Sequence, residues 1–296
     1  MKKFAWWILF GLSLIFSLPA SGAEPLLRII SYGNDLTQSE RAAVSKSFPL
    51  PADVKLAEVK TIIVTNEEEW GLLRGLVPDV QIGTKAVSSV YIEKLAAGVG
   101  IKVDTQNITF ITPHIYANAL STAGVADARI FATAPQPVSG TAALVGIFKS
   151  FASLTGKSIA PSLQRTAAEE LITTGNLGEK VGKERAAVLV ERAKERVIQE
   201  QAATKENVTK IIEQSAKEQD LSLSKQDKQQ LAELMLKIEQ LNLDLNALQK
   251  QIKNYQTTPE PSQPEQPQSF LDRMLEFIKA LFSKFFSFVG RMIVGH

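Results

Sequence analysis

The sequence predicts an α+β fold: an N-terminal α/β sandwich, then a long helical hairpin and a separate C-terminal amphipathic helix. Three observations predict it. Between residues 24 and 175, β-branched runs of strand length alternate with capped helical segments. From 176 to 255 the chain lacks proline and is rich in Lys, Glu, Gln, Ala and Leu. An aromatic amphipathic segment at 270–296 follows a Pro/Gln-rich linker at 256–269.

Residues 1–23 have the pattern of an export signal. Two lysines follow the initial methionine, an apolar stretch fills 4–18, and Pro19 interrupts it. Residues 21–23 then fit the small-x-small rule for cleavage. We therefore expect an exported protein whose mature chain begins at residue 24, with an uncleaved anchor helix as the alternative.

The first helix of the α/β domain is expected after Thr37, which forms a T-x-x-E capping box with Glu40. The strand-like run 58–65 leads to a second helix, for which Asn66 is the expected N-cap. Three acids, Glu67–Glu69, occupy the first turn of that helix. They suggest either a metal site or a solvated helix start matched to the helix dipole, and we favour the second interpretation.

The centre of the domain reads as two strands, a helix and another strand. The runs 85–95 and 100–110 are expected to form a hairpin through Ala96-Ala97-Gly98. The helix that follows begins with Thr112 as N-cap and Pro113 as its first residue, and ends at Gly124.

Residues 127–134 are the next strand, and Ser139 is expected to cap a helix that ends at Gly156. A further helix is predicted from Pro161 to Gly175. From residue 58 to 133 the order is strand, helix, strand, strand, helix, strand, which is that of a ferredoxin-like split βαβ sandwich.

The region 176–255 predicts a helical hairpin of two long helices that break near 220–222. An apolar stripe in its second half is typical of a coiled-coil seam or of a helix packed on its partner. The stripe consists of Leu231, Met235, Ile238, Leu241, Leu245, Leu248, Ile252 and Tyr255. The linker 256–269 is expected to be extended because its composition builds no core.

The segment 270–296 is expected to form a helix with a wide apolar face and a narrow polar stripe. Spanning a bilayer would bury Glu276, Lys279 and Lys284, each at roughly 2.5–3.5 kcal/mol near the centre. Lying in the interface avoids that cost, and docking on the globular domain or self-association are the alternatives. The predicted membrane-surface residues are Phe270, Leu271, Met274, Leu275, Ile278, Phe282, Phe285, Phe286, Val289 and Ile293.

No recognisable catalytic motif occurs in the sequence. A serine hydrolase would rest on His114 and Ser139, but PVSGT is not a nucleophile elbow. A surface position for His114 and a capping role for Ser139 explain both residues without catalysis. Nothing in the sequence pairs two carboxylates for glycoside hydrolysis. The acids considered are Asp35, Asp79, Glu93, Asp104 and Asp127.

Composition excludes several classes of site and partner. The chain has no cysteine, which excludes disulfides, thiolate metal sites and a lipid-modified N-terminal cysteine. Zinc is not expected with only two histidines, and no motif supports calcium or another cofactor. Charges of both signs are interleaved around a net charge of +2, so nucleic acid is not an expected partner.

Six segments between residues 28 and 255 resemble a known family. They are GNDLT, VTNEEE, GLVPDVQIGTKAVSSVYIE, ITFITPHIYANALSTAGV, APQPVSGTAALVGIFKSF and AAEELITTGNLGEKVG. In this order they resemble domain-of-unknown-function family 1002, a family of secreted Firmicute proteins. The resemblance implies a Gram-positive, exported, envelope-associated protein. It implies no catalytic residues, because no activity is established for the family.

These features favour an exported cell-envelope protein of non-enzymatic binding or structural role, held at the membrane surface by its C-terminal helix. Its partner would be an envelope protein or polymer. One alternative is a hydrolase or transferase that acts on peptidoglycan or teichoic acid. A second is a structural protein of the envelope that self-assembles into a homo-oligomer through the helices between 179 and 255.

Overall fold

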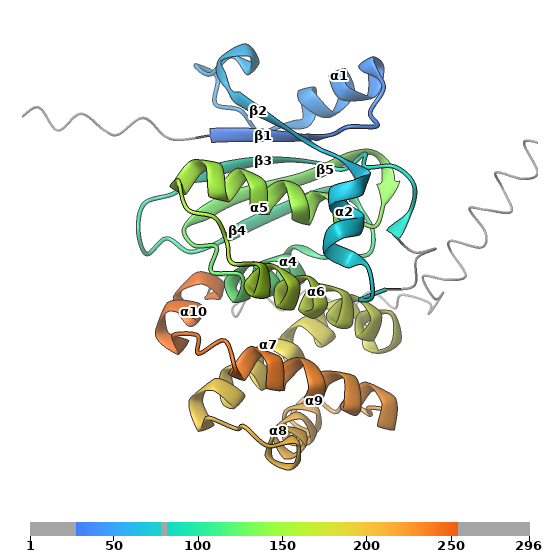
Figure 1. Ribbon diagram of the computed structural model, residues 1–296, viewed down its shortest axis with the longest axis vertical. Helices are drawn as coiled ribbons and strands as arrows, with labels where there is room; N and C mark the ends of the chain where they lie inside the picture. Colours follow the sequence, from blue (N-terminus) through green and yellow to red (C-terminus); the bar gives the residue numbers. More distant parts are fainter. Residues whose placement is uncertain (1–27, 78–81, 254–296) are drawn as a thin grey trace, which may run out of the picture.

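The computed structural model describes residues 28–77 and 82–253 (Figure 1). It confirms the α+β class, with one five-stranded sheet and a helical layer. In chain order the elements are β1 (Arg28–Gly33), α1 (Gln38–Ser47), the 3-10 helix η1 (Leu56–Glu58), β2 (Lys60–Val64), α2 (Asn66–Leu73), β3 (Ser89–Lys94), β4 (Lys102–Ile108), α4 (Pro113–Thr122), β5 (Ala128–Val138), α5 (Thr141–Thr155), α6 (Pro161–Val181), α7 (Lys183–Glu200), α8 (Lys205–Lys217), α9 (Lys225–Glu239) and α10 (Leu245–Ile252).

The sheet is mixed, with the strand order β2-β1-β3-β5-β4. β1 and β2 pair in parallel, and so do β4 and β5. β3 lies between these two pairs and runs antiparallel to both β1 and β5. Four strands therefore point in one direction, and their carboxyl ends lie along a single edge of the sheet.

The predicted ferredoxin-like pairing is wrong, although the element order from β2 to β5 is the predicted one. In a split βαβ unit another strand separates the parallel strands, whereas here each parallel pair is adjacent. The hairpin through residues 96–98 is wrong as well, because β5 lies between β3 and β4. β3 is buried over five of its six residues, and burial on both faces does not indicate which strand lies beside it.

The two faces of the sheet build separate cores. Strand side chains alternate between faces, so Val90 and Ile92 of β3 point to one side and Tyr91 to the other. The first side forms the main core with α2, α4, α5, α6 and α10. On the second side α1 covers the sheet, and Phe48, the residue after α1, packs edge-on against Tyr32 with ring centroids 5.8 Å apart.

A second layer of helices continues beyond α6. Apolar side chains of α7, α8 and α9, together with Leu177 of α6, form their own buried cluster. Figure 1 shows α8 and α9 at the opposite end of the molecule from α1, with the sheet and α6 between them. Among residues 28–77 and 82–253, none of the helices combines the length and the apolar run that crossing a membrane requires.

The prediction of two long helices after residue 176 is wrong. Up to residue 253, where the described part of the chain ends, four helices follow α6, and their connections contain residues with positive φ: Gly182 (93°), Gln201 (51°), Asp220 (52°) and Asn242 (50°). Left-handed residues of this kind end helices without any proline. Except for the glycine, these breaks use polar residues that are also common on exposed helix surfaces, so composition did not reveal them.

The predicted apolar stripe is divided between two cores. Leu231, Met235 and Ile238 of α9 belong to the second cluster, whereas Leu248 and Ile252 of α10 pack into the main core. The stripe is therefore not one continuous seam in the described residues. Tyr255, the linker 256–269 and the segments 1–23 and 270–296 lie outside the described residues.

Helix α6 continues past its predicted end at Gly175 and reaches Val181. A Cβ atom at Gly175 would come within 2.5–2.9 Å of three ring atoms of Phe110. This glycine therefore allows the helix to pass close to the end of β4 and does not terminate the helix. The predicted domain boundary at 175 accordingly falls inside a helix.

Candidate functional site

Four helix starts meet at one edge of the sheet. β1, β2, β4 and β5 point the same way, and each leads directly or through a short loop into α1, α2, α4 or α5 at that edge. We call this the carboxyl edge and define it by segments 33–37, 65–69, 109–114 and 138–141. In open α/β sheets, ligands bind in the crevice outside such strand ends. The carboxyl edge is therefore where a binding site is expected first.

Side-chain caps fix the first two helix starts. The predicted capping box of Thr37 and Glu40 is confirmed at α1. At α2 the N-cap is Thr65 and not Asn66, which is the first helical residue. The Thr65 hydroxyl accepts from the Glu68 backbone N–H at 3.2 Å, and the Glu68 carboxylate accepts from the Thr65 N–H at 2.9 Å. This reciprocal box orients the acidic first turn of α2.

The start and end of α4 follow the predicted pattern. Thr112 caps the helix by accepting from the Ile115 N–H, and Pro113 is the first residue. Gly124 follows the last turn with φ of 76°. The Val125 N–H then bonds to the Leu120 carbonyl at 3.0 Å, which is the closing bond of a Schellman motif.

Helix α5 begins differently from the prediction. Its N-cap is Gly140, with φ of 99°, and no side chain caps it. Ser139, the predicted cap, lies one residue earlier, with its Oγ 3.0 Å from Oγ1 of Thr141. The Gly140 carbonyl accepts a hydrogen bond of 2.6 Å from the buried Tyr116 hydroxyl of α4. This bond ties the start of α5 to α4.

Glu69 was expected to be solvated with its two neighbours, and this expectation is wrong. Glu67 is exposed and Glu68 is half-buried in the capping box, but Glu69 is only 2% exposed. Its Oε1 accepts from the Thr141 hydroxyl at 2.5 Å. Burial raises the pKa of Glu69 to about 7, because the lowering by hydrogen bonds from Thr141 and Asn66 is smaller. The first turn of α2 is therefore not a fully solvated acidic start.

Asp35 contributes a further negative charge that raises the pKa of Glu69. Asp35 also accepts from the Ala86 N–H at 2.7 Å, while its own N–H donates to the Ala86 carbonyl at 3.1 Å. This exchange fastens the loop before β3 to the end of β1. A buried carboxyl group with a strongly raised pKa beside a second carboxylate is a candidate functional group.

The sequence contains one signal that Glu69 is buried. Leu73 follows Glu69 by four residues, lies on the same helix face and is fully buried. An acid that shares a face with a buried leucine is itself a candidate for burial. Thr141, its partner, is 72 residues away in the chain, and nothing local indicated that contact.

His114 is not the surface residue that was expected. It is 3% exposed, and its two ring nitrogens lie 3.0 Å from a carboxylate oxygen of Glu184 and 2.6 Å from one of Glu191. Burial by itself would lower the pKa of His114, but hydrogen bonds and charge from the two glutamates outweigh burial and raise it to about 9. The imidazole is therefore protonated at neutral pH and donates from both nitrogens.

This arrangement leaves His114 without a nitrogen that could take a proton from Ser139. Both nitrogens carry protons that are directed at carboxylates of α7. Ser139 lies beside Thr141 at the start of α5. The geometry is that of an ion cluster and not that of a serine–histidine pair, which requires a neutral imidazole facing the hydroxyl.

A fully buried ion pair lies one helical turn further along α7. Lys194 and Glu170 are both 0% exposed, and Nζ lies 2.7 Å from Oε1. The ammonium also donates to the Asn118 carbonyl at 2.8 Å and to the Thr122 hydroxyl at 3.0 Å. The sequence indicated none of this, because the partners of Lys194 lie in two other helices, α4 and α6.

The other acids that were considered as a catalytic pair lie in different parts of the structure. Glu93 pairs with Arg28 at 2.8 Å, and Asp127 accepts from the Gly100 N–H at 2.8 Å in a turn with φ of 49°. Asp104 is exposed on β4, and Asp79 lies outside the described residues. Within residues 28–77 and 82–253, His, Asp and Glu side chains do not gather in groups of three or more that could hold a metal ion.

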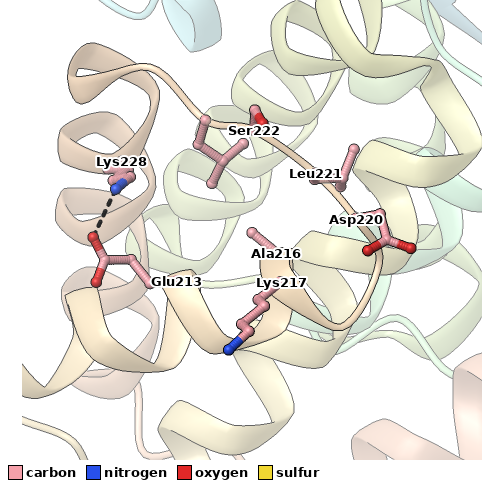
Figure 2. Close-up of a pocket in the computed structure, with 8 residues that line it drawn as sticks. Glu213, Ala216, Lys217, Asp220, Leu221, Ser222 and Lys228 are labelled. Atoms are coloured by element: carbon pink, nitrogen blue, oxygen red, sulfur yellow. Dashed lines mark hydrogen bonds and ion pairs between the residues drawn. The ribbon is translucent and has the colours of Figure 1, made fainter.

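A surface hollow lies between α8 and α9, with a volume of about 550 Å³ (Figure 2). Its wall includes Leu221 and Leu223 and the ion pair of Lys228 with Glu213 at 2.7 Å. The chain turns here at Asp220, whose φ is positive. The hollow mixes both signs of charge with apolar groups, and its shape and lining single out no ligand class.

The ten predicted membrane-surface residues, from Phe270 to Ile293, lie outside the described residues. The structure therefore places none of them relative to the carboxyl edge or to the hollow between α8 and α9.

Comparison with known proteins relates the chain to one family. A model of the family described as "Protein of unknown function (DUF1002)" matches residues 32–255. The "Uncharacterized protein YpuA" of Bacillus subtilis (strain 168) is 32% identical over 257 residues, covering 86% of this chain and 87% of that protein. No solved structure matches the chain. The matched region begins in β1 and ends just after α10, and the chain belongs to the DUF1002 family.

Proposed function

We propose that the protein is an exported, envelope-associated binding module that works without catalysing a reaction. In this proposal, residues 1–23 direct export and the segment 270–296 holds the protein at the outer face of the membrane. The partner is an envelope protein or polymer bound outside the strand ends, at the carboxyl edge.

The observation that carries the proposal is the amphipathic pattern of 270–296. If this segment is plotted as a helix, aromatic and aliphatic residues cover a wide face and polar residues form a narrow stripe. The segment contains four basic residues and two acidic ones. Such a segment binds an anionic lipid surface through apolar burial and charge. The composition of residues 256–269 predicts an extended, Pro-rich linker, which at about 3.1 Å per residue would let the anchor reach on the order of 40 Å from the folded domain.

The carboxyl edge supports a binding role more than a catalytic one. Among the described residues, the imidazole near this edge is that of His114, and it is held between two carboxylates. The Glu69 carboxyl is covered and bonded to Thr141. Asp35 and Ser139 are partly exposed there, and polar groups of this kind at strand ends bind ligands in many α/β sheets.

Vesicle co-sedimentation tests the anchoring. The mature chain is compared with a variant in which Phe282, Phe285 and Phe286 are replaced by Gln, using vesicles that contain anionic lipid. The matched control replaces Ser283 and Ser287 of the polar stripe by Gln, which adds the same residue in the same segment. We expect the control to pellet like the unchanged chain and the phenylalanine variant to stay in solution. The anchor is refuted if all three proteins pellet equally. It is also refuted if a chain that ends at residue 269 pellets as well as the mature chain.

A second candidate function is a carboxylate-dependent hydrolase of peptidoglycan or teichoic acid. The observation that favours it is the pair Glu69 and Asp35, in which burial raises the pKa of Glu69 to about 7. A protonated carboxyl near an ionised one is the arrangement that glycoside hydrolysis uses.

Digestion of purified peptidoglycan and teichoic acid distinguishes the two functions. If the hydrolase is correct, product appears with the unchanged chain and is lost in Glu69→Gln but not in Glu67→Gln, which alters an exposed acid of the same turn. An activity that instead depends on His114 and Ser139 would point to the serine version. Absence of product from every form supports the binding module.

A further inference from the structure

A row of charged side chains crosses the sheet at the end opposite the carboxyl edge. β1, β4 and β5 begin at this end, and the antiparallel β3 finishes there. Strand register places Glu93 of β3 between Arg28 and Arg129. Lys102 of β4 lies on the other side of Arg129. Directly opposite residues of neighbouring strands point to the same face, so the row has three cations and one acid.

The acid of this row is already engaged. Glu93 is 8% exposed, and its Oε1 lies 3.0 Å from Nε and 2.8 Å from Nη2 of Arg28. Arg129 and Lys102 are exposed, and neither has a hydrogen bond or ion pair with a residue of the described ranges 28–77 and 82–253. Like charges directly opposite each other destabilise a sheet. The fold therefore holds two cations side by side at a cost that an external anion would relieve.

Two more exposed lysines lie beside the row. Lys94 is the last residue of β3, and Lys253 donates to the Gly98 carbonyl at 3.2 Å in the loop between β3 and β4. Asp127, just before β5, is half-buried and accepts from a backbone N–H of that loop at 2.8 Å. The acid of β4, Asp104, lies two residues further from this end. We call the four exposed cations the basic edge: Lys94, Lys102, Arg129 and Lys253.

The first and last described residues both lie at this end of the sheet. Arg28 is the first residue of β1. After α10 the chain returns to the beginning of β4 and β5, where the Gln251 carbonyl accepts from the Ile101 N–H at 2.9 Å and its side chain accepts from the Asp127 N–H at 2.8 Å. Figure 1 shows α10 and the start of β1 on the same side of the molecule. The segment 270–296 is therefore joined to the folded domain beside the basic edge.

The carboxyl edge has the opposite charge. Its four segments contain no lysine or arginine, and the imidazolium of the third segment is held between two glutamates. Its acids are Asp35, Glu67, Glu68 and Glu69. Lys149 of α5 pairs with one of them, Glu68, at 2.6 Å. The two edges lie about 20 Å apart, because β3 has six residues at about 3.3 Å each. The sheet therefore has a positive end and a negative end.

We propose that the basic edge binds the phosphate groups of anionic lipids, so that the domain stands with this end of its sheet on the membrane and the carboxyl edge facing away. This orientation rests on the proposed function, because the anchor brings the domain to the lipid surface. The linker 256–269 would reach on the order of 40 Å and does not by itself select a side of the domain. Charge selects it, since an anionic surface attracts lysine and arginine and repels the acids of the carboxyl edge.

The basic edge suits a surface of many charges better than a single small anion. Its four cations are exposed and come from β3, β4, β5 and the residue after α10, so they are spread along the end of the sheet. Sites for small molecules are concave and bury most of the ligand. An extended anionic polymer could also follow such an edge. Lipid is favoured because the chain that carries the proposed anchor leaves the domain here.

Vesicle binding of the full mature chain tests the contact. Lys102→Gln combined with Arg129→Gln should weaken binding to vesicles that contain phosphatidylglycerol about 25-fold, at about fivefold for each charge. The matched control combines Lys217→Gln with Lys225→Gln, which removes the same charge from exposed positions of α8 and α9. It should change the affinity less than about twofold, because these positions lie beyond a Debye length from the surface. Urea unfolding should show no loss of stability in the first variant, since it removes a like-charge pair.

Energy transfer to an acceptor dye on the lipid head groups measures the orientation. The chain has no cysteine, so Ala97→Cys and Asn34→Cys each provide a single labelling site. Both positions are exposed, the first beside the basic edge and the second at the carboxyl edge. We expect more transfer from residue 97 than from residue 34, and we expect the difference to disappear when Lys102 and Arg129 are replaced by Gln. Equal transfer from the two sites in the otherwise unchanged chain refutes the orientation.

Binding by the basic edge and binding by the anchor fail separately. If the variant of Lys102 and Arg129 binds vesicles like the unchanged chain, the basic edge does not contact lipid, whatever the anchor does. If that variant is weakened but replacement of Phe282, Phe285 and Phe286 has no effect, the basic edge stands and the anchor is wrong. Absence of vesicle binding by the unchanged chain refutes both. Loss of binding to purified teichoic acid, with vesicle binding unchanged, assigns the basic edge to a polymer and overturns the proposal.

Discussion

Replacing Glu69 by glutamine should make the protein more stable at alkaline pH and change it little at acidic pH. Glu69 is 2% exposed and accepts from the Thr141 hydroxyl, a bond that a glutamine oxygen can also accept. The difference between the two side chains is therefore chiefly the charge that glutamate carries when it ionises. That charge is buried beside Asp35, and no cation is among the causes that shift its pKa.

The magnitude follows from the shifted pKa. Burial raises the pKa of Glu69 from 4.5 to about 7 in the folded chain. The unfolded chain therefore releases this proton first, and stability falls as the pH rises from 4.5 to about 7. At about 1.4 kcal/mol for each pH unit, the ionised group costs about 3 kcal/mol above neutral pH. Glu69→Gln removes that cost.

Urea unfolding at about pH 4 and about pH 8 measures the effect, because the change between the two values isolates the titrating group. We expect the free energy of unfolding of Glu69→Gln, relative to the unchanged chain, to rise by about 3 kcal/mol from the first pH to the second. The control Glu67→Gln, at an exposed residue of the same turn, should change by less than about 0.5 kcal/mol. If the difference in unfolding free energy between Glu69→Gln and the unchanged chain does not change with pH, Glu69 is not a buried acid that lacks an ion-pair partner.

Two more substitutions, one of them with a matched glycine control, test the carboxyl edge and the buried pair of Lys194 with Glu170, all by urea unfolding. Gly140→Ala should lose about 2 kcal/mol or more, because φ is 99° and a Cβ would come within 2.5 Å of the Tyr116 hydroxyl. Gly124→Ala, with φ of 76° and open space around it, should lose only about 1 kcal/mol; equal losses would contradict the steric argument. Glu170→Gln should cost about 3–5 kcal/mol, because it leaves the Lys194 ammonium buried without its counter-charge. A loss below about 1 kcal/mol would mean that water reaches this ammonium.

Local signals in the sequence predicted the four helix starts at the carboxyl edge to within one residue. The boxes and caps at Thr37 and Thr112 and the helix end at Gly124 each depend on side chains within a few residues. Two predicted N-caps were wrong by one residue. Thr65 caps α2 in place of Asn66, and Gly140 occupies the N-cap position of α5 in place of Ser139. Competing caps of similar quality in adjacent positions explain both errors.

Strand neighbours and helix breaks were harder to predict. β3 reads as a buried strand, but its pattern carries no information on whether β4 or β5 lies beside it. The breaks at Gln201, Asp220 and Asn242 use polar residues in the left-handed region, which are also ordinary on helix surfaces. These features depend on packing between distant segments.

The buried polar groups could not be predicted for the same reason. Glu69, His114 and Lys194 find partners 72, 70 and 24 residues away in the chain. Taken alone, each was most simply explained as a solvated residue. Only the leucine four residues after Glu69 hinted at burial, and no such hint accompanied His114.

The proposed function requires an exported chain that its aromatic segment holds at the membrane. The most direct measurement is fractionation of Gram-positive cells that produce the full chain or the variant with Phe282, Phe285 and Phe286 replaced by Gln. We expect the unchanged chain to stay with the membrane fraction and to be degraded by protease added to intact cells, and we expect the variant to be released into the medium. Retention of both forms in the cytoplasm, or equal membrane association of the two, would contradict it.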